Sequence, residues 1–128
     1  MVGFSHIYTK DERQQMLDEK RKEFTAILTK IPGKKKKAAR AIAAQAAFLA
    51  VAVRELDEIV MRDGYVEEYQ NGENQRGTKK TVAADLLDRY TKTYTTAIRQ
   101  IVDLLPDEEA RQSAKDELTE FMRQRPGV

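Results

Sequence analysis

An unbroken apolar seam is the feature that most constrains what this chain can fold into. Between residues 34 and 63, apolar side chains recur at alternating spacings of three and four, which lets one helix face another along its whole length. The seam consists of Ala39, Ile42, Ala46, Leu49, Val53, Leu56 and Val60. Alanines dominate its first half, and Ala50 widens the small surface, so a neighbouring helix can approach closely.

A second seam with the same rhythm follows between about residues 82 and 105, and Pro106 ends it because proline cannot continue a helix. Its positions are Ala83, Leu87, Tyr90, Tyr94, Ala97, Ile101 and Leu104. Two long helices joined by residues 64–80 predict an antiparallel helical hairpin. We therefore expect an all-α fold built on residues 34–106.

Shorter helices are expected on both sides of this hairpin. In the segment 1–33, Thr9 and Glu12 have the spacing of a capping box, and Phe24, Ile27 and Ile31 share one helical face before Pro32 and Gly33. In the segment 107–128, acidic residues from Asp107 favour a helix start through the helix dipole. The last residues resemble a frayed tail.

The connection at residues 64–80 is long and polar for a compact domain. It contains Asn71-Gly72, the leading signal for a two-residue type I′ hairpin turn, which needs positive φ at both positions. Tyr65, Val66 and Tyr69 favour a strand before that turn. We expect a short, exposed β-hairpin, with an irregular solvated loop as the alternative.

Composition argues against several classes of protein. The chain has 128 residues and no cysteine, so a disulfide framework and a thiolate metal site are excluded. We see neither an N-terminal apolar signal nor an apolar run long enough to span a bilayer, and expect a cytoplasmic protein without membrane contact.

Residues for catalysis are scarce. His6 is the single histidine, and Glu55, Asp57 and Glu58 are most simply the solvated face of a long helix. Neither a nucleophile with its base nor a phosphate-binding loop can be assembled from such a set. We therefore expect no enzyme, no cofactor and no metal.

Positive charge concentrates in the first third of the chain. Residues 1–40 hold eleven Lys or Arg against five Asp or Glu, whereas the remaining residues are net acidic. Lys34, Lys35, Lys36, Lys37 and Arg40 lie at the start of the second helix, where cations oppose the helix dipole. Phosphate neutralisation is the natural use of such a cluster, and the predicted partner is double-stranded DNA. Lys20, Arg21 and Lys22 extend this site if the first helix folds back; a lysine run that only aids solubility is the alternative.

The two seams offer more apolar surface than one hairpin can bury, and self-association is the usual remedy. We therefore predict a homo-oligomer whose subunit interface uses both long helices. The predicted interface residues are Ala46, Leu49, Ala50, Val53, Leu56, Tyr90, Tyr94 and Ile101.

Residues 40–106 show a distinctive order of features: a long helix that ends in glycine, a Tyr-x-Asn-Gly turn, Gln-x-Gly-x-Lys, and a helix with spaced tyrosines that runs to Leu-Leu-Pro. These positions are Gly64, Val66, Tyr69, Asn71, Gly72, Gln75, Gly77, Lys79, Tyr90, Tyr94, Leu104, Leu105 and Pro106. In this order of features the chain resembles the small subunit of phage terminase.

The resemblance implies a non-catalytic DNA-packaging factor that acts in the host cytoplasm. Such a subunit assembles into a ring, binds viral DNA and recruits the large terminase subunit, which carries the ATPase and nuclease. Two other classes stay open. A small helical DNA-binding regulator would share the lysines and form a dimer, and a protein-interaction module, such as a phage-encoded inhibitor, would bind no DNA.

Overall fold

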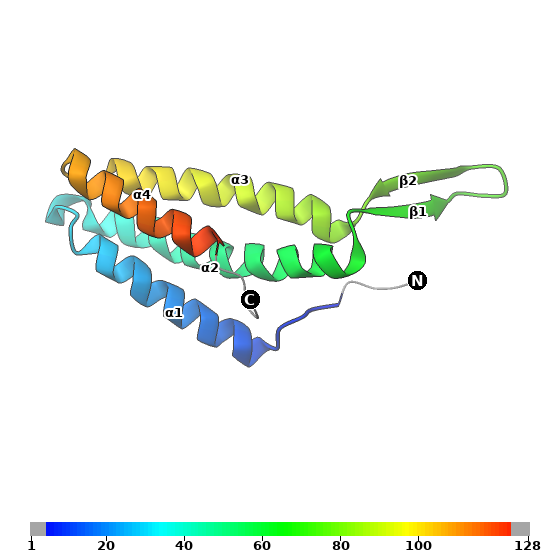
Figure 1. Ribbon diagram of the computed structural model, residues 1–128, viewed down its shortest axis with the longest axis horizontal. Coiled ribbons are helices and arrows are strands. Elements are labelled where there is room, and N and C mark those ends of the chain that lie inside the picture. Colours follow the sequence, from blue (N-terminus) through cyan, green and yellow to red (C-terminus); the bar gives the residue numbers. More distant parts are fainter. Residues whose placement is uncertain (1–4, 124–128) are drawn as a thin grey trace.

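The computed structural model describes residues 5–123, without the side chains of Leu118 and residues 121–123. It is mostly helical with one small antiparallel sheet, which confirms the expected all-α fold with a β-hairpin at the connection (Figure 1). The elements are α1 (Lys10–Leu28), α2 (Gly33–Asp63), β1 (Val66–Gln70), β2 (Arg76–Lys80), α3 (Val82–Asp103) and α4 (Glu108–Arg123). The expected tail at residues 124–128 lies outside the described part.

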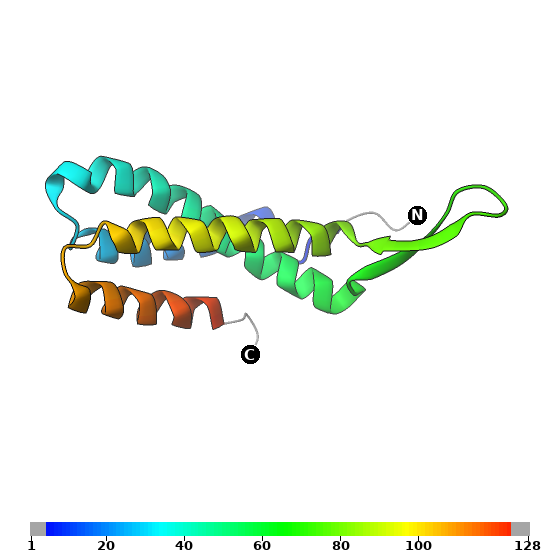
Figure 2. The ribbon, with the colours of Figure 1, turned by 90° about the horizontal axis from the view of Figure 1, so that it is seen from above.

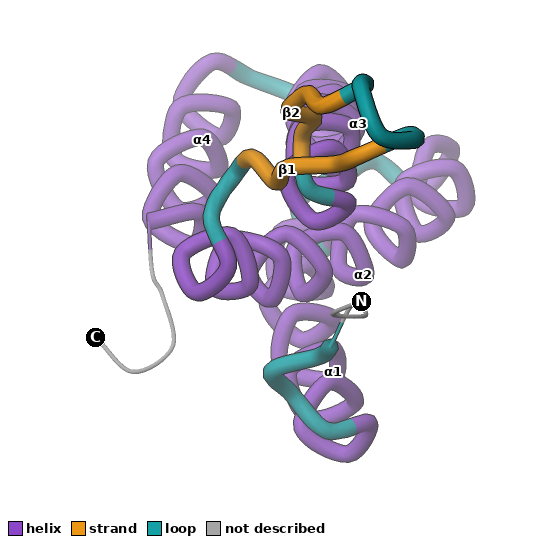
Figure 3. Tube along the Cα trace, turned by 90° about the vertical axis from the view of Figure 1, so that its right-hand side faces the viewer, coloured by secondary structure: helices purple, strands orange, loops and turns teal. Residues whose placement is uncertain are grey.

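The long helices α2 and α3 form the antiparallel hairpin that the seams predict, and they make the most extensive contact between elements. α1 packs against α2, and α4 packs against α3 (Figures 1 and 2). The β-hairpin projects beyond one end of this helical body, and the α1–α2 and α3–α4 turns lie at the opposite end. Seen end-on, α1 and α4 lie on different sides of the central pair (Figure 3).

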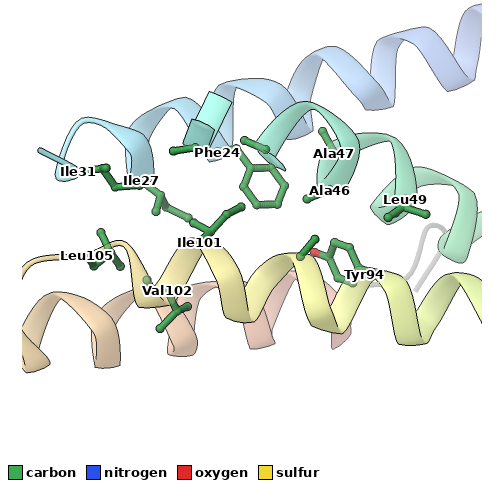
Figure 4. Close-up of a cluster of buried hydrophobic side chains, with 14 residues drawn as sticks. Phe24, Ile27, Ile31, Ala46, Ala47, Leu49, Tyr94, Ile101, Val102 and Leu105 are labelled. Atoms are coloured by element: carbon green, nitrogen blue, oxygen red, sulfur yellow. The ribbon is translucent and has the colours of Figure 1, made fainter. Parts of the chain in front are cut away.

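The main core lies where α1 crosses the alanine-rich half of α2. Phe24 and Ile27 of α1 are almost fully buried, and they lie beside Ala46 and Ala47 of α2 and Ile101 of α3 (Figure 4). Short alanine side chains allow this close approach of the three helices. A second, smaller cluster lies nearer the β-hairpin and consists of Leu56, Ile59, Val60 and Ala83.

The core corrects the predicted subunit interface at five of its eight positions. Ala46, Leu49, Leu56, Tyr94 and Ile101 are at most 5% exposed within the single chain. Their side chains are covered because the two seams face each other and because α1 and α4 cover the rest. Ala50, Val53 and Tyr90 are half-buried. A contact with a second copy therefore needs side chains outside the seams in addition to these three.

Local sequence signals place the ends of the helices where they are expected. The Thr9 side chain accepts a hydrogen bond from the Glu12 N–H, and the Glu12 side chain accepts one from the Thr9 N–H, so the predicted capping box forms. Gly64 follows α2 with a φ of 84°, a conformation that favours glycine. The Asp107 side chain accepts from the Ala110 N–H at the start of α4.

The β-hairpin forms, but with a wider turn than the type I′ turn that Asn71-Gly72 predicts. The last strand pair is Gln70 with Arg76, which leaves residues 71–75 as the loop. Gly72 has a φ of 84°, whereas Asn71 has no positive φ. The Asn71 N–H donates to the Gln75 carbonyl at 2.9 Å and closes the loop. This five-residue loop needs a positive φ at Gly72 only, whereas a type I′ turn would need one at Asn71 as well.

Changing Gly72 tests this loop. We expect Gly72→Val to disfavour the hairpin by about 1–3 kcal/mol, because a β-branched residue is strained at this φ. Gly72→Asn is the matched control, because asparagine tolerates positive φ better than other residues. Cross-strand contacts between Glu68 and Thr78, measured by NMR, should be lost in the first variant and kept in the second. Equal contacts in both variants would contradict this turn geometry.

Enlarging an alanine tests the close contact between helices. Ala46 is 0% exposed, so we expect Ala46→Leu to overpack the core and to lower the free energy of unfolding by about 1–3 kcal/mol. Ala41→Leu, on the exposed face of the same helix, is the control and should change stability little. Chemical denaturation measures both, and equal stabilities would argue against tight packing at Ala46.

Candidate nucleic-acid interface

The predicted cationic cluster occupies the first two turns of α2. Lys34, Lys35, Lys37 and Arg40 are exposed and Lys36 is half-buried. The first turn contains no acidic residue, and the N-cap Pro32 offers no side-chain hydrogen bond to the free N–H groups. Positive side chains and the positive end of the helix dipole therefore coincide.

These five cations have no carboxylate partner among the described residues. Within the described residues, no ion pair joins Lys34, Lys35, Lys36, Lys37 or Arg40 to an acid. Four consecutive lysines with uncompensated charge repel one another and the helix dipole. The cluster therefore costs folding stability, and a bound anion would relieve that cost.

α1 adds to this cluster only in part. A shallow groove between α1 and α2 is lined by both Arg21 and Arg40, with Phe24 and Ala43 among the apolar residues beside them. Arg21 lies 3.9 Å from Asp18 on the surface, a pair too exposed to hold it firmly. The fold thus brings together two arginines that lie far apart in the sequence.

Lys22 and Lys20 have different environments. Lys22 is exposed on α1. Lys20 is only 6% exposed, and its Nζ lies 3.1 Å from Glu23 Oε2. Lys20 is therefore not exposed to a DNA partner in this conformation, because packing against the bundle covers the side chain and a carboxylate pairs it.

Acidic residues lie at the same end of the body. α4 begins there, directly after Asp107 and with Glu108 and Glu109 in its first turn (Figure 1). In the described chain they make no ion pair with the α2 lysines. The positive surface is consequently confined to the α1–α2 side of this end.

No protein-family model, curated protein or solved structure matches this chain. Among the described residues, no group of three or more histidines or carboxylates is arranged to hold a metal ion. None of the helices in the described range is long and apolar enough to cross a membrane.

Glu55 has a structural role that its sequence context does not reveal. The expectation of a solvated side chain is wrong for Glu55, which is 5% exposed. Its Oε2 accepts hydrogen bonds from the backbone N–H groups of Ile7 at 3.0 Å and Tyr8 at 2.8 Å. Its Oε1 lies 3.2 Å from Arg13 Nε and 3.5 Å from His6 Nδ1. One carboxylate thus ties the segment before α1 to the middle of α2.

Tyr8 shares this environment. Burial, with the Glu58 carboxylate beside it, raises the pKa of Tyr8 above its ordinary value. The phenol therefore stays neutral well into the alkaline range. The Glu55 carboxylate thus holds the segment that precedes α1, beside a partly buried Tyr8 side chain that carries no charge.

Replacing the carboxylate tests this attachment. We expect Glu55→Gln to lower the free energy of unfolding by about 1–3 kcal/mol, because the amide cannot satisfy both backbone N–H groups and Arg13. Amide exchange at Ile7 and Tyr8 should accelerate. Glu19→Gln, an exposed position on α1, is the control. Unchanged exchange at Ile7 and Tyr8 would show that Glu55 does not hold this segment.

Proposed function

We propose that this protein is a non-catalytic DNA-packaging factor of the terminase small-subunit type. In this proposal it self-associates, binds duplex DNA and cooperates with a large subunit that performs the chemistry. The resemblance of residues 40–106 suggests the class, and the cation cluster of α2 supplies the physical support.

The observation that carries the proposal is the set of five cations at the start of α2, which make no ion pair with an acid in the part of the chain that the structure describes. Cations that oppose their own helix dipole do not stabilise the helix, so another interaction must account for them. Phosphate groups fit best, because each contact releases counterions and gains affinity without reading sequence. Arg40, which shares a groove with Arg21, extends the phosphate contacts from α2 to α1.

The acidic start of α4 restricts how DNA can approach. Phosphates are repelled by Asp107, Glu108 and Glu109 and attracted by the lysines, so the duplex would lie over the α1–α2 side. The acidic residues on α4 then remain available for a protein partner, and we assign this helix to the contact with the large subunit.

One observation favours a protein-interaction module as the second candidate. The aromatic side chain of Phe48 is 56% exposed in an apolar groove on the α1 side of the bundle. An exposed aromatic of this kind is typical of a protein contact. A chain that uses such contacts alone would show no salt-dependent binding to DNA.

The decisive experiment compares two variants of equal net charge. In the first, Lys34, Lys35, Lys36 and Lys37 are changed to Gln; in the control, Lys79, Lys80, Lys92 and Lys115 are changed to Gln. We expect the first variant alone to lose DNA affinity steeply. The slope of log K against log salt should fall by about one for each phosphate contact removed.

Circular dichroism checks that both variants remain folded, and solution mass checks that their oligomeric state is unchanged. If both bind DNA as the unmodified chain does, the lysine run is a solvated surface and the DNA-binding proposal fails. If both variants lose affinity equally, DNA affinity depends on the net charge of the protein and there is no localised DNA site.

A further inference from the structure

The β-hairpin presents an aromatic face to solvent. Side chains alternate between the two faces of a strand, so Glu67 and Tyr69 of β1 lie on the same side. Tyr65 precedes the strand and continues its pairing by accepting a hydrogen bond from the Thr81 N–H, so we place its side chain on that side too. Tyr65 is 67% exposed and Tyr69 is 40% exposed. The hairpin projects beyond the helices (Figure 1), and no other strand of the described residues pairs with either of its edges. A two-stranded sheet of this kind is only marginally stable by itself in water.

Local contacts nevertheless hold the hairpin in one shape. The ring of Tyr69 lies over Gly77 so closely that a Cβ at Gly77 would come within 2.8 Å of the Tyr69 hydroxyl oxygen. At the base, the Thr81 N–H donates to the Tyr65 carbonyl at 2.9 Å, and the Thr81 hydroxyl donates to the Gly64 carbonyl at 3.1 Å. The aromatic face is therefore preorganised, which lowers the entropic cost of binding a partner.

The same chain carries a groove of matching chemistry. A cavity of about 420 Å³ opens between α1, α2 and α3. Leu17, Phe48, Leu86 and Tyr90 contribute apolar and aromatic surface to it. α1 diverges from α2 toward the α1 N-terminus (Figure 1).

The charges of groove and hairpin are complementary. Lys10 and Arg13 of α1 line the groove together with Glu55. Arg13 is paired with Glu55 at 3.2 Å, whereas Lys10 makes no ion pair within the described chain. Glu67 lies between the two tyrosines, and its partner Lys79 is 3.6 Å away on an exposed surface, where such a pair contributes little. The hairpin thus presents Glu67 between Tyr65 and Tyr69, and the apolar groove presents Lys10 as its complement.

We propose that the hairpin of one copy docks its Tyr65–Tyr69 face into the α1–α2–α3 groove of a second copy. The tyrosines contact Phe48 and Tyr90, and Glu67 approaches Lys10. This contact rests on the proposed self-association, but not on DNA binding. Tyrosine is well suited to such a contact, because it buries a large area and loses little side-chain freedom.

The dimensions are compatible with this contact. Each strand has five residues and is therefore about 17 Å long. The stretch of α2 from Phe48 to Leu56, which borders the groove, covers about 12 Å. The hairpin is long enough to cross the groove while its base stays attached to its own helices.

Photo-crosslinking identifies the contact directly. Tyr69 is replaced by p-benzoylphenylalanine, which keeps an aromatic ring at this position, and the chain is mixed with ¹⁵N-labelled unmodified protein. We expect crosslinks between labelled and unlabelled chains, located by mass spectrometry at Phe48, Tyr90 or their neighbours in the groove. Crosslinks within one chain only, or between two hairpins, would overturn the proposal.

Solution mass tests the energetics. Phe48→Ala and Tyr69→Ala should each weaken self-association at least tenfold, and the double variant should lose little more, because the two side chains belong to one contact. Val82→Ala, which shortens a 59% exposed side chain outside the groove, is the control and should have no effect.

The outcomes separate the two proposals. Undiminished self-association in the Phe48 and Tyr69 variants would overturn the hairpin contact and leave the proposed function intact. A monomeric unmodified chain at all concentrations would overturn both the contact and the proposed self-association. DNA binding of the monomer would then decide between the two remaining classes.

Discussion

The close approach of three helices at the alanine-rich face of α2 determines the rest of the structure. Ala39, Ala43, Ala46 and Ala47 are all at most 5% exposed. Because these side chains are short, Phe24 of α1 can insert between α2 and α3, next to Ile101. Larger residues here would separate α1 from the hairpin. The groove that joins Arg21 to Arg40 would then be lost, because it exists only while the two helices touch.

Signals that act within one turn of chain could be read from the sequence. The Thr9–Glu12 capping box, the positive φ of Gly64 and Gly72, and the start of α4 after Asp107 all follow from local backbone chemistry. The two long helices follow from periodicity alone. The width of the hairpin turn could not be predicted in this way. The hydrogen bond between Asn71 and Gln75 favours a five-residue loop over the two-residue alternative.

Properties that depend on distant parts of the chain could not be predicted. Glu55 is buried because a segment 47 residues earlier folds over it and donates backbone N–H groups. The sequence around Glu55 contains no pattern that predicts this burial. Lys20 belongs to a basic run, yet its position on the helix turns it toward the bundle and Glu23. Periodicity also predicted that Leu49 and Tyr94 make apolar contacts. It did not show that these contacts lie within one chain and not between two copies.

The length of α2 sets the distance between the two ends of the molecule. With 31 residues, this helix spans about 46 Å, and it carries the lysines at one end and the β-hairpin at the other. An assembly joined near the hairpin end would keep the cation clusters of its subunits away from the contact and present them outward. Spacings of tens of ångströms are comparable with the helical repeat of DNA, about 34 Å. In the proposed assembly, the length of α2 would contribute to the distance between successive contacts with a duplex.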